Sequence, residues 1–307
     1  MTGGAGFIGS NIVEALVDEG VEVVVLDDLY LGTEDNLGDV KDDIDFVKGS
    51  VLDVETVQSA IEGCDTVFHQ AARSSAPMHQ NDPAEGVRVN VEGFINTVEA
   101  AKKTSVEKIV YASTSSMYGS VEPPHSEDQD TPPTNLYTAS KMSRELYAKV
   151  YSQVTDIDFT GLRYFSVYGP HERGKGKYAN VVTQFLWKML DGEQPVIFGD
   201  GTQTRDFTYV KDVARANMLA AERRDELNGN VFNVGTGVET SFNEVIVKLN
   251  KILGTDIDAE RIDNPIDNYV ARTKADTSRS RKVLGFEASR SFGEGLQKTV
   301  DYYSRAQ

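Results

Sequence analysis

A glycine-rich run, Gly3-Gly4-Ala5-Gly6-Phe7-Ile8-Gly9, lies almost at the start of the chain. Glycines at 3, 6 and 9 suit a backbone that turns tightly off a strand and opens a helix, whose amino end can hold the pyrophosphate of a dinucleotide. A helical stretch follows, and then an apolar strand that ends at Asp27. An acidic residue at this position accepts hydrogen bonds from the adenine-ribose hydroxyls and repels a 2′-phosphate. The pattern therefore predicts a site for NAD rather than NADP.

Only Met1 and Thr2 precede this run, so we expect the strand that should lead into it to be truncated. A central strand would add about four buried apolar residues, each worth roughly 1.5–3 kcal/mol. Their sum, of order 6–12 kcal/mol, rivals the whole stability of a typical domain. We therefore expect either that the natural start lies upstream or that something else fills this position in the sheet.

Composition narrows the class of protein. The 307 residues, 39% of them hydrophobic, suffice for one large or two smaller domains. The net charge of −17 argues against nucleic acid or an anionic membrane as a partner. No stretch has the apolar length of a membrane span, and Cys64 is the only cysteine, which together favour the cytoplasm. The four histidines have no metal-ligand spacing, so no metal site is expected.

Short apolar runs alternate with helical patterns through the first half of the chain. We expect strands at 21–27, 44–48, 66–69, 108–112 and 159–163, and helices at 11–19, 54–61, 83–102 and 136–151. Nearly continuous apolar strands are typical of a parallel sheet covered on both faces. The prediction is a doubly wound α/β (Rossmann) domain over residues 1–165, to which a later strand at 230–234 returns.

After about residue 165 glycine, proline and charged residues cluster between further helices, expected at 181–190, 211–222 and 242–253. Residues 166–307 are predicted to form a second, smaller α/β domain that binds the substrate.

Tyr137 and Lys141 lie four residues apart at the start of a predicted helix and so on one face of it. A lysine ammonium near a phenol lowers the pKa of the phenol, and the phenolate can remove a proton from an alcohol. A hydroxyl-rich loop, residues 113–119, follows the strand at 108–112 and could hydrogen-bond a reacting sugar oxygen. By themselves, the pair could be an ordinary exposed helix face and the loop an ordinary polar turn.

Further motifs are spread over almost the whole chain. They are His69-Gln70-Ala71-Ala72, Asn90-Val91-Glu92-Gly93, Arg163-Tyr164-Phe165-Ser166-Val167-Tyr168-Gly169-Pro170, Gly199-Asp200-Gly201 and Arg205-Asp206-Phe207. With the glycine run and the Tyr137/Lys141 pair, they make the chain resemble the extended short-chain dehydrogenases/reductases of the NAD-dependent epimerase/dehydratase family, most of all UDP-glucose 4-epimerase-type enzymes. The resemblance implies NAD, a UDP-sugar substrate and a homodimer formed through the helices near 91–102 and 137–151.

The resemblance also implies roles for residues in the cofactor site. Tyr137 would be the catalytic base, Lys141 would assist it and grip the nicotinamide ribose, and Thr114 would bridge tyrosine and substrate. The remaining implied NAD contacts are Gly3, Gly6, Phe7, Ile8, Gly9, Asp27, Asp28, Ser50, Val51, Ser74, Asn90 and Tyr164.

One of these positions departs from the family pattern. Ser50 stands where the family has an aspartate for the adenine amino group. Asp53 could replace that aspartate, but it opens a predicted helix and is better interpreted as its N-cap.

For the substrate side, the resemblance implies contacts from Ser75, Thr114, Ser166, Asn180, Phe198 and Arg205. Arg205 would hold the diphosphate, because an anionic ligand in so acidic a protein needs a fixed cation. The alternative for Arg205 is an ion pair with Asp206 or Asp212.

The residues after Thr114 separate the reactions that this family supports. By the resemblance, 4,6-dehydratases carry an Asp-Glu pair there and UDP-glucuronate decarboxylases a Glu, whereas this chain has Ser115 and Ser116. We therefore expect C4 epimerisation by transient oxidation to a 4-ketosugar. Alternatives are a uronate 4-epimerase, which also carries a hydroxyl residue where Ser166 stands, a dehydratase or decarboxylase, and a truncated, non-catalytic NAD-binding protein. Thr273 aligns near a bulky residue that excludes N-acetyl groups in some glucose enzymes, so N-acetylhexosamines would also be admitted.

Overall fold

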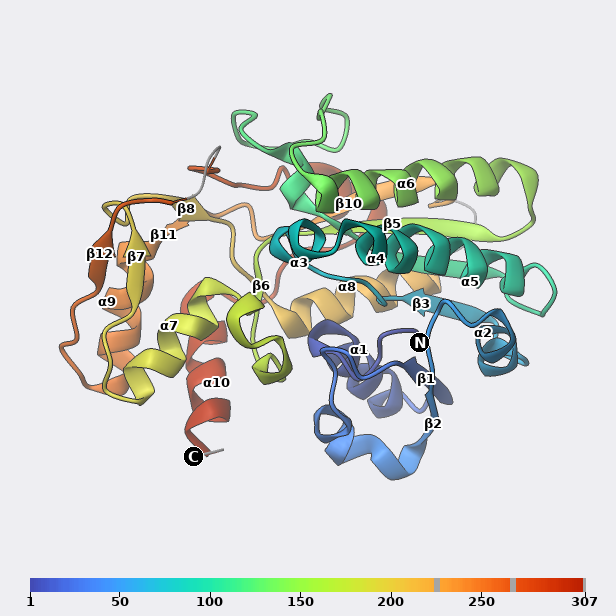
Figure 1. The fold of residues 1–307 in the computed structure, drawn as a ribbon, viewed down its shortest axis with the longest axis horizontal. Helices are drawn as coiled ribbons and strands as arrows, with labels where there is room; N and C mark the ends of the chain where they lie inside the picture. Colours follow the sequence, from blue (N-terminus) through green and yellow to red (C-terminus); the bar gives the residue numbers. More distant parts are fainter. Residues whose placement is uncertain (224–226, 266–268, 306–307) are drawn as a thin grey trace.

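A parallel sheet forms the centre of the amino-terminal part of the chain, as predicted (Figure 1). The computed structural model describes residues 1–223, 227–265 and 269–305. Across the sheet, the order of strands is β2, β1, residues 1–2, β3, β4, β5 and β10. Their bounds are β1 (Val23–Asp27), β2 (Ile44–Lys48), β3 (Thr66–His69), β4 (Lys108–Thr114), β5 (Asp158–Tyr164) and β10 (Asn230–Val234).

Met1 and Thr2 occupy the position between β1 and β3. Thr2 bridges Leu26 on one side and His69 on the other, and its N–H donates to the Phe68 carbonyl at 3.0 Å. These two residues make the contacts of a first strand at the carboxyl end of the sheet. They lead directly into the glycine turn, where the Gly3 N–H donates to the Leu26 carbonyl at 2.8 Å.

Helices cover both faces of the sheet, which explains why its central strands are nearly continuous apolar runs. On one face α1 (Phe7–Asp18) and α8 (Val210–Glu222) pack over a core that includes Val25, Val110 and Phe232. On the other face α2 (Val54–Ile61), α5 (Gly93–Ala101) and α6 (Leu136–Val154) pack over a core that includes Val67, Ile109 and Phe159. The doubly wound α/β prediction is thus confirmed.

The predicted helix at 83–102 is confirmed, and it contains a π-helical turn in its middle. It consists of α4 (Pro83–Val87), a π-helical turn (Arg88–Glu92) and α5, and it follows the short α3 (Ala76–Asn81). A π-helical turn shifts the backbone hydrogen bonds by one residue and is frequent at functional sites. Here it turns the Asn90 side chain inward, where it is fully buried.

The rest of the chain builds a second apolar core, seen at the left of Figure 1. This core gathers Tyr168, Leu186, Phe207, Leu249 and Leu296. Its larger elements are α7 (Val181–Leu190), α9 (Phe242–Leu253) and α10 (Phe292–Arg305). The shorter ones are β6 (Val167–Tyr168), β7 (Val196–Phe198), β8 (Thr204–Arg205), β9 (Thr208–Tyr209), β11 (Thr240–Ser241) and β12 (Glu260–Ile262). Elsewhere in the chain are 3-10 turns at Glu34–Asp43, Ser115–Tyr118 and Arg173–Tyr178 and a π turn at Ser280–Leu284.

Within the described residues, every helix is too short or too polar to cross a bilayer.

Candidate active site

A cavity of about 430 Å³ opens at the carboxyl ends of the strands, where ligands bind in doubly wound sheets. Both parts of the chain line it. The predicted residues on its wall are Gly3, Gly6, Phe7, Ile8, Gly9, Asp27, Asp28, Val51, Ser74, Ser75, Thr114, Tyr137, Lys141, Tyr164, Ser166 and Asn180. Four predicted residues are not on this wall: Ser50, Asn90, Phe198 and Arg205.

The glycine turn is shaped for close approach. Gly3 has a φ of +70°, and a Cβ there would lie 2.6 Å from the backbone nitrogen of Ala71. A Cβ on Gly9 would lie 2.0 Å from the Gly3 carbonyl oxygen, so only glycine lets α1 begin against the turn. Phe7 and Ile8 open α1, whose first turn carries no acidic residue. Its free N–H groups and dipole therefore suit a pyrophosphate.

Asp27 stands at the end of β1, on the wall of the same cavity. Its carboxylate accepts hydrogen bonds from the N–H of Ala5 at 2.9 Å and the N–H of Leu29 at 2.8 Å, which fix its orientation. Burial raises the pKa of Asp27, while these backbone hydrogen bonds oppose the rise. With the glycine turn, this carboxylate fits the adenosine half of NAD.

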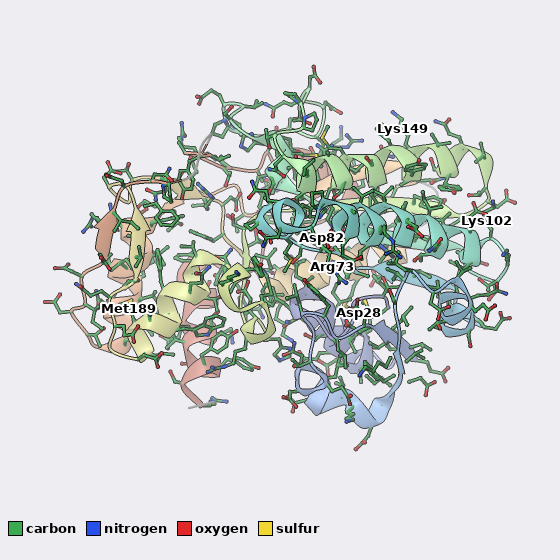
Figure 2. The ribbon with its side chains drawn as sticks, in the orientation of Figure 1. Asp28, Arg73, Asp82, Lys102, Lys149 and Met189 are labelled. Carbon is green, nitrogen blue, oxygen red and sulfur yellow. The ribbon has the colours of Figure 1, made fainter. Side chains whose placement is uncertain are left out.

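Arg73, which the sequence did not single out, lines the cavity next to Asp28, and Figure 2 labels the two near each other. Its guanidinium pairs with Asp28 at 3.2 Å and Glu85 at 2.8 Å and stacks 3.7 Å from the ring centroid of Tyr30. The loops after β1 and β3 are thereby tied together. The residues next to Arg73 in the sequence form no motif that predicts this role.

Tyr137 and Lys141 project from the first turns of α6. Asn135 caps this helix in a capping box with Thr138, which fixes where the first turn begins. The Lys141 ammonium lies 5.9 Å from the Tyr137 ring centroid and donates to the Ala112 carbonyl at 3.2 Å. Thr114 ends β4 opposite them, and its hydroxyl accepts from the N–H of Ser116 at 3.1 Å. The three predicted catalytic residues thus share one cavity wall.

Burial has the largest effect on the pKa values of Tyr137 and Lys141. It raises the pKa of the Tyr137 phenol, while a hydrogen bond with Thr114 and the charge of Arg144 act in the opposite direction. Burial lowers the pKa of Lys141 well below its ordinary value, and the Arg144 charge lowers it further.

Asn90 lies behind the cavity wall and supports it. Its amide donates to the Arg73 carbonyl at 3.2 Å and to the Ser140 hydroxyl at 2.9 Å, and its oxygen accepts from the Arg73 N–H at 2.8 Å. The residue therefore links the loop after β3 to the catalytic helix α6.

Two expectations at the adenine end have different outcomes. Asp53 is the N-cap of α2, as the sequence favoured, since it accepts from the N–H and the hydroxyl of Thr56 at 3.2 and 2.8 Å. Ser50 accepts from the Leu52 N–H at 3.2 Å, and it is the neighbouring Val51 that lines the cavity.

On the substrate side, Ser166 has a φ of +29°, a conformation that non-glycine residues seldom adopt. Such backbone strain concentrates at ligand sites. Asn180 caps α7 by accepting from the Val182 N–H at 3.0 Å. Lys175 and Tyr178 join them on the cavity wall and were not predicted.

Arg205 and Phe198 lie beyond the cavity wall, in the second part of the chain. The Arg205 guanidinium donates to the Thr204 carbonyl at 2.7 Å and lies 5.3 Å from the Tyr269 ring centroid. Asp206 instead accepts from Thr236, Gly237 and Ala275, and Asp212 pairs with Arg215 and Arg290. The ion-pair alternative for Arg205 is therefore wrong among the described residues. Phe198 ends β7, and its carbonyl accepts from Gln203 at 2.9 Å.

Comparisons with known proteins agree with this site. A UDP-glucose 4-epimerase of Mycolicibacterium smegmatis is 36% identical over 308 residues, which cover 99% of this chain and 97% of that protein. A UDP-N-acetylglucosamine 4-epimerase of Methanobrevibacter ruminantium, solved with UDP-N-acetylmuramic acid, superposes with a TM-score of 0.93 at 33% identity over 100% of this chain and 97% of that one. A UDP-glucose 4-epimerase of Thermotoga maritima, solved with UDP-glucose, superposes with a TM-score of 0.93 at 34% identity over 99% and 98%. Residues 1–235 match the NAD dependent epimerase/dehydratase family, and the chain belongs to that family.

Proposed function

We propose that this protein is an NAD-dependent 4-epimerase of a UDP-sugar, either UDP-glucose and UDP-galactose or their N-acetyl analogues. The proposal rests on one observation: Tyr137, Lys141 and Thr114 lie on the wall of the same cavity as the glycine turn. The activities of the relatives support the same reaction class.

Each residue has a defined task in this reaction. The Tyr137 phenolate takes the proton of the sugar 4-hydroxyl and later returns it, with Thr114 hydrogen-bonded to both. Lys141 adds positive charge beside the phenolate. NAD supplies a reversible hydride acceptor when bound. The 4-ketosugar rotates in the pocket while its UDP stays anchored, so that the opposite face of C4 is reduced and the hydroxyl re-forms with the opposite configuration.

The residues after Thr114 favour epimerisation over elimination. Ser115 and Ser116 line the cavity where dehydratases are expected to have carboxyl groups. A serine hydroxyl cannot act as a general acid near neutral pH, because its proton is held far too tightly. Epimerisation is therefore favoured over loss of water from C5 and C6.

The division of labour between the two parts of the chain belongs to the same proposal. Residues 1–165, with the strand at 230–234, hold NAD, and residues 166–307 hold the nucleotide sugar. In a chain of net charge −17, the Arg205 guanidinium, which has no carboxylate partner among the described residues, is the candidate for the diphosphate.

A uronate 4-epimerase is the second candidate. The observation in its favour is Ser166, which is strained and lies on the cavity wall, since a hydroxyl can hydrogen-bond a carboxylate.

Thr273 bears on whether N-acetylated UDP-sugars are also substrates. Its hydroxyl accepts from the Asp206 N–H at 3.3 Å, and its side chain is too small to block an N-acetyl group.

We further propose a cytoplasmic homodimer that pairs through α5 and α6. Along α6, the apolar side chains of Leu146, Val150 and Val154 are 67, 57 and 70% exposed. Such a row at helical spacing is typical of a covered face. Light scattering should give twice the chain mass for the wild type and for Val247→Glu, which changes an exposed valine on α9, and a monomer for Val150→Glu. A monomeric wild type would exclude this interface.

The reaction is tested by incubating the protein with UDP-glucose, UDP-galactose, both N-acetyl analogues and UDP-glucuronate, with and without added NAD, and separating the products. We expect interconversion of at least one C4 pair, with loss of the reaction in Tyr137→Phe. A 4-keto-6-deoxy product would assign a dehydratase. No conversion of any of the five would refute the proposal.

A further inference from the structure

Arg144 is a buried cation that the proposed reaction does not yet use. It lies on α6, three residues after Lys141, and its side chain is completely buried. Its guanidinium donates to the carbonyls of Asn90 at 3.0 Å, Ala112 at 3.1 Å and Ala71 at 3.2 Å. Among residues 1–223, 227–265 and 269–305, no carboxylate forms an ion pair with it.

An uncompensated buried charge is costly and therefore informative. Arg163, the other buried arginine near this helix, is neutralised by Glu145 at 2.7 Å. Three carbonyl dipoles and the Phe94 ring, 5.5 Å away, solvate the Arg144 charge without cancelling it. Burial lowers the pKa of Arg144 only to about 10, so the group stays cationic at neutral pH.

The charge is located beside the catalytic pair. The Lys141 ammonium and the Arg144 guanidinium donate to the same oxygen, the Ala112 carbonyl, at 3.2 and 3.1 Å. Ala112 and Ala71 are on the cavity wall, so Arg144 holds two of its backbone segments from behind. The charge of Arg144 also lowers the pKa of Tyr137 and of Lys141.

The other ionisable groups around the pair add little charge at neutral pH. The ring of His79 on α3 meets that of Tyr137 edge to face with centroids 5.5 Å apart, and burial lowers the pKa of both His79 and His69. Burial raises the pKa of Tyr111 and of Tyr164. Glu145 is engaged by Arg163. Among the charged groups near the phenol, Arg144 is thus the one whose charge lowers the pKa of Tyr137.

We propose that Arg144 is a positioning residue for the epimerisation: its fixed positive charge favours the phenolate form of Tyr137, and its hydrogen bonds hold the carbonyl oxygen that orients Lys141. The inference rests on the proposed function, in which Tyr137 is the base. It gives the tyrosine a second cation, and a guanidinium keeps its charge at every pH near neutrality.

The test compares Arg144→Met and Arg144→Gln, which remove the charge, with Arg144→Lys, which keeps it. Arg144→Gln is included because its amide keeps N–H donors for the buried carbonyls, so this variant should fold even if Arg144→Met does not. The control is Lys108→Met, which removes another completely buried cation, at the opposite end of β4. Two readouts are taken: the acid limb of the pH profile of kcat/KM, and the phenol titration of Tyr137 by tyrosinate absorbance, as the difference from the matching Tyr137→Phe protein.

In the charge-removing variants, we expect both titrations to move up by about one pH unit, so that kcat/KM below the limb falls about tenfold. Arg144→Lys should move less, and Lys108→Met should lower Tm without moving either titration. A folded Arg144→Met or Arg144→Gln protein with the wild-type acid limb and phenol titration would overturn the inference. Full activity in Tyr137→Phe would instead overturn the proposed function itself.

Discussion

The Arg163 guanidinium on β5 and the Glu145 carboxylate on α6 form a bidentate ion pair, with Nε–Oε1 at 3.0 Å and Nη2–Oε2 at 2.7 Å. The same Oε1 accepts the Ser113 hydroxyl at 2.5 Å. The pair therefore fastens the catalytic helix to two central strands, one residue before Thr114. Both side chains are largely buried, at 8 and 13% exposed.

Removing one partner of this pair should destabilise the fold. Glu145→Gln or Arg163→Met leaves an uncompensated buried charge, which costs about 3–5 kcal/mol. The double variant Glu145→Leu/Arg163→Met should cost less than the sum of the two single variants. Denaturant unfolding measures each free energy. Glu34→Gln, which breaks an exposed pair with Lys41, should cost no more than about 1 kcal/mol. Equal costs for the buried and exposed pairs would contradict this prediction.

Tyr137→Phe removes the proposed base and leaves the ring. We expect kcat to fall by about 10²–10⁴-fold, with unchanged circular dichroism, because the lost group acts in proton transfer and not in packing. Tyr151→Phe is the control, since it removes a phenol hydroxyl farther along α6, where it donates to Glu99 at 2.8 Å. Steady-state rates near neutral pH distinguish the two, and comparable losses in both variants would argue against Tyr137 as the base.

Asp27→Asn should weaken NAD binding. A carboxylate hydrogen-bonded to a ribose contributes about 1.5–3 kcal/mol, so Kd should rise about 10- to 150-fold. The matched change Asp53→Asn tests the alternative adenine contact and should leave Kd unchanged, because Asp53 caps α2. Titration of the apoprotein with NAD measures both. A larger rise in Kd for Asp53→Asn than for Asp27→Asn would indicate that Asp53 contacts the cofactor.

Arg205→Met should raise KM for the UDP-sugar and weaken UDP binding by about 1.5–3 kcal/mol, with a smaller effect on kcat. The reason is that the proposed contact to the diphosphate is the same in the ground state and in the transition state. Arg281→Met, at a 60% exposed side chain paired with Glu287, serves as the control for loss of one positive charge. An unchanged affinity for UDP in Arg205→Met would remove it from the substrate site.

Stability should fall as the pH falls below about 6.5. Burial lowers the pKa of all four histidines, His69, His79, His125 and His171. The unfolded chain therefore binds more protons than the folded one in this range, at up to about 1.4 kcal/mol per histidine and pH unit. Melting curves between about pH 7.5 and 5.5 check the sign. His125→Phe keeps the stacking on Tyr118, 4.7 Å between centroids, and should give a shallower pH slope. A flat profile in the wild type would contradict the prediction.

The strands and most helices could be predicted because each depends on neighbouring residues. The strands at 44–48, 66–69 and 230–234 and the helices at 54–61, 181–190 and 242–253 have the predicted bounds. The π-helical turn within the helix at 83–102 could not be predicted, since its residues are equally compatible with a regular α-helix. Packing of Gly93 against Val51, where a Cβ would lie 2.5 Å from the valine methyl, depends on a segment some forty residues away. The helix α10 was missed too, although its sequence alternates apolar and polar residues at helical spacing.

By itself, the sequence determined the glycine turn, the acidic residue at the end of β1 and the Tyr137/Lys141 helix face, because each is a short-range pattern with one backbone solution. Only the tertiary structure decided which charges remain without a carboxylate partner. Among the described residues, Arg73 pairs with Asp28 and Glu85 and Arg163 pairs with Glu145, whereas Arg144 donates its hydrogen bonds to carbonyl oxygens. The partner of an arginine depends on which distant segments the fold brings within reach, and the residues next to the arginine in the sequence do not indicate that partner.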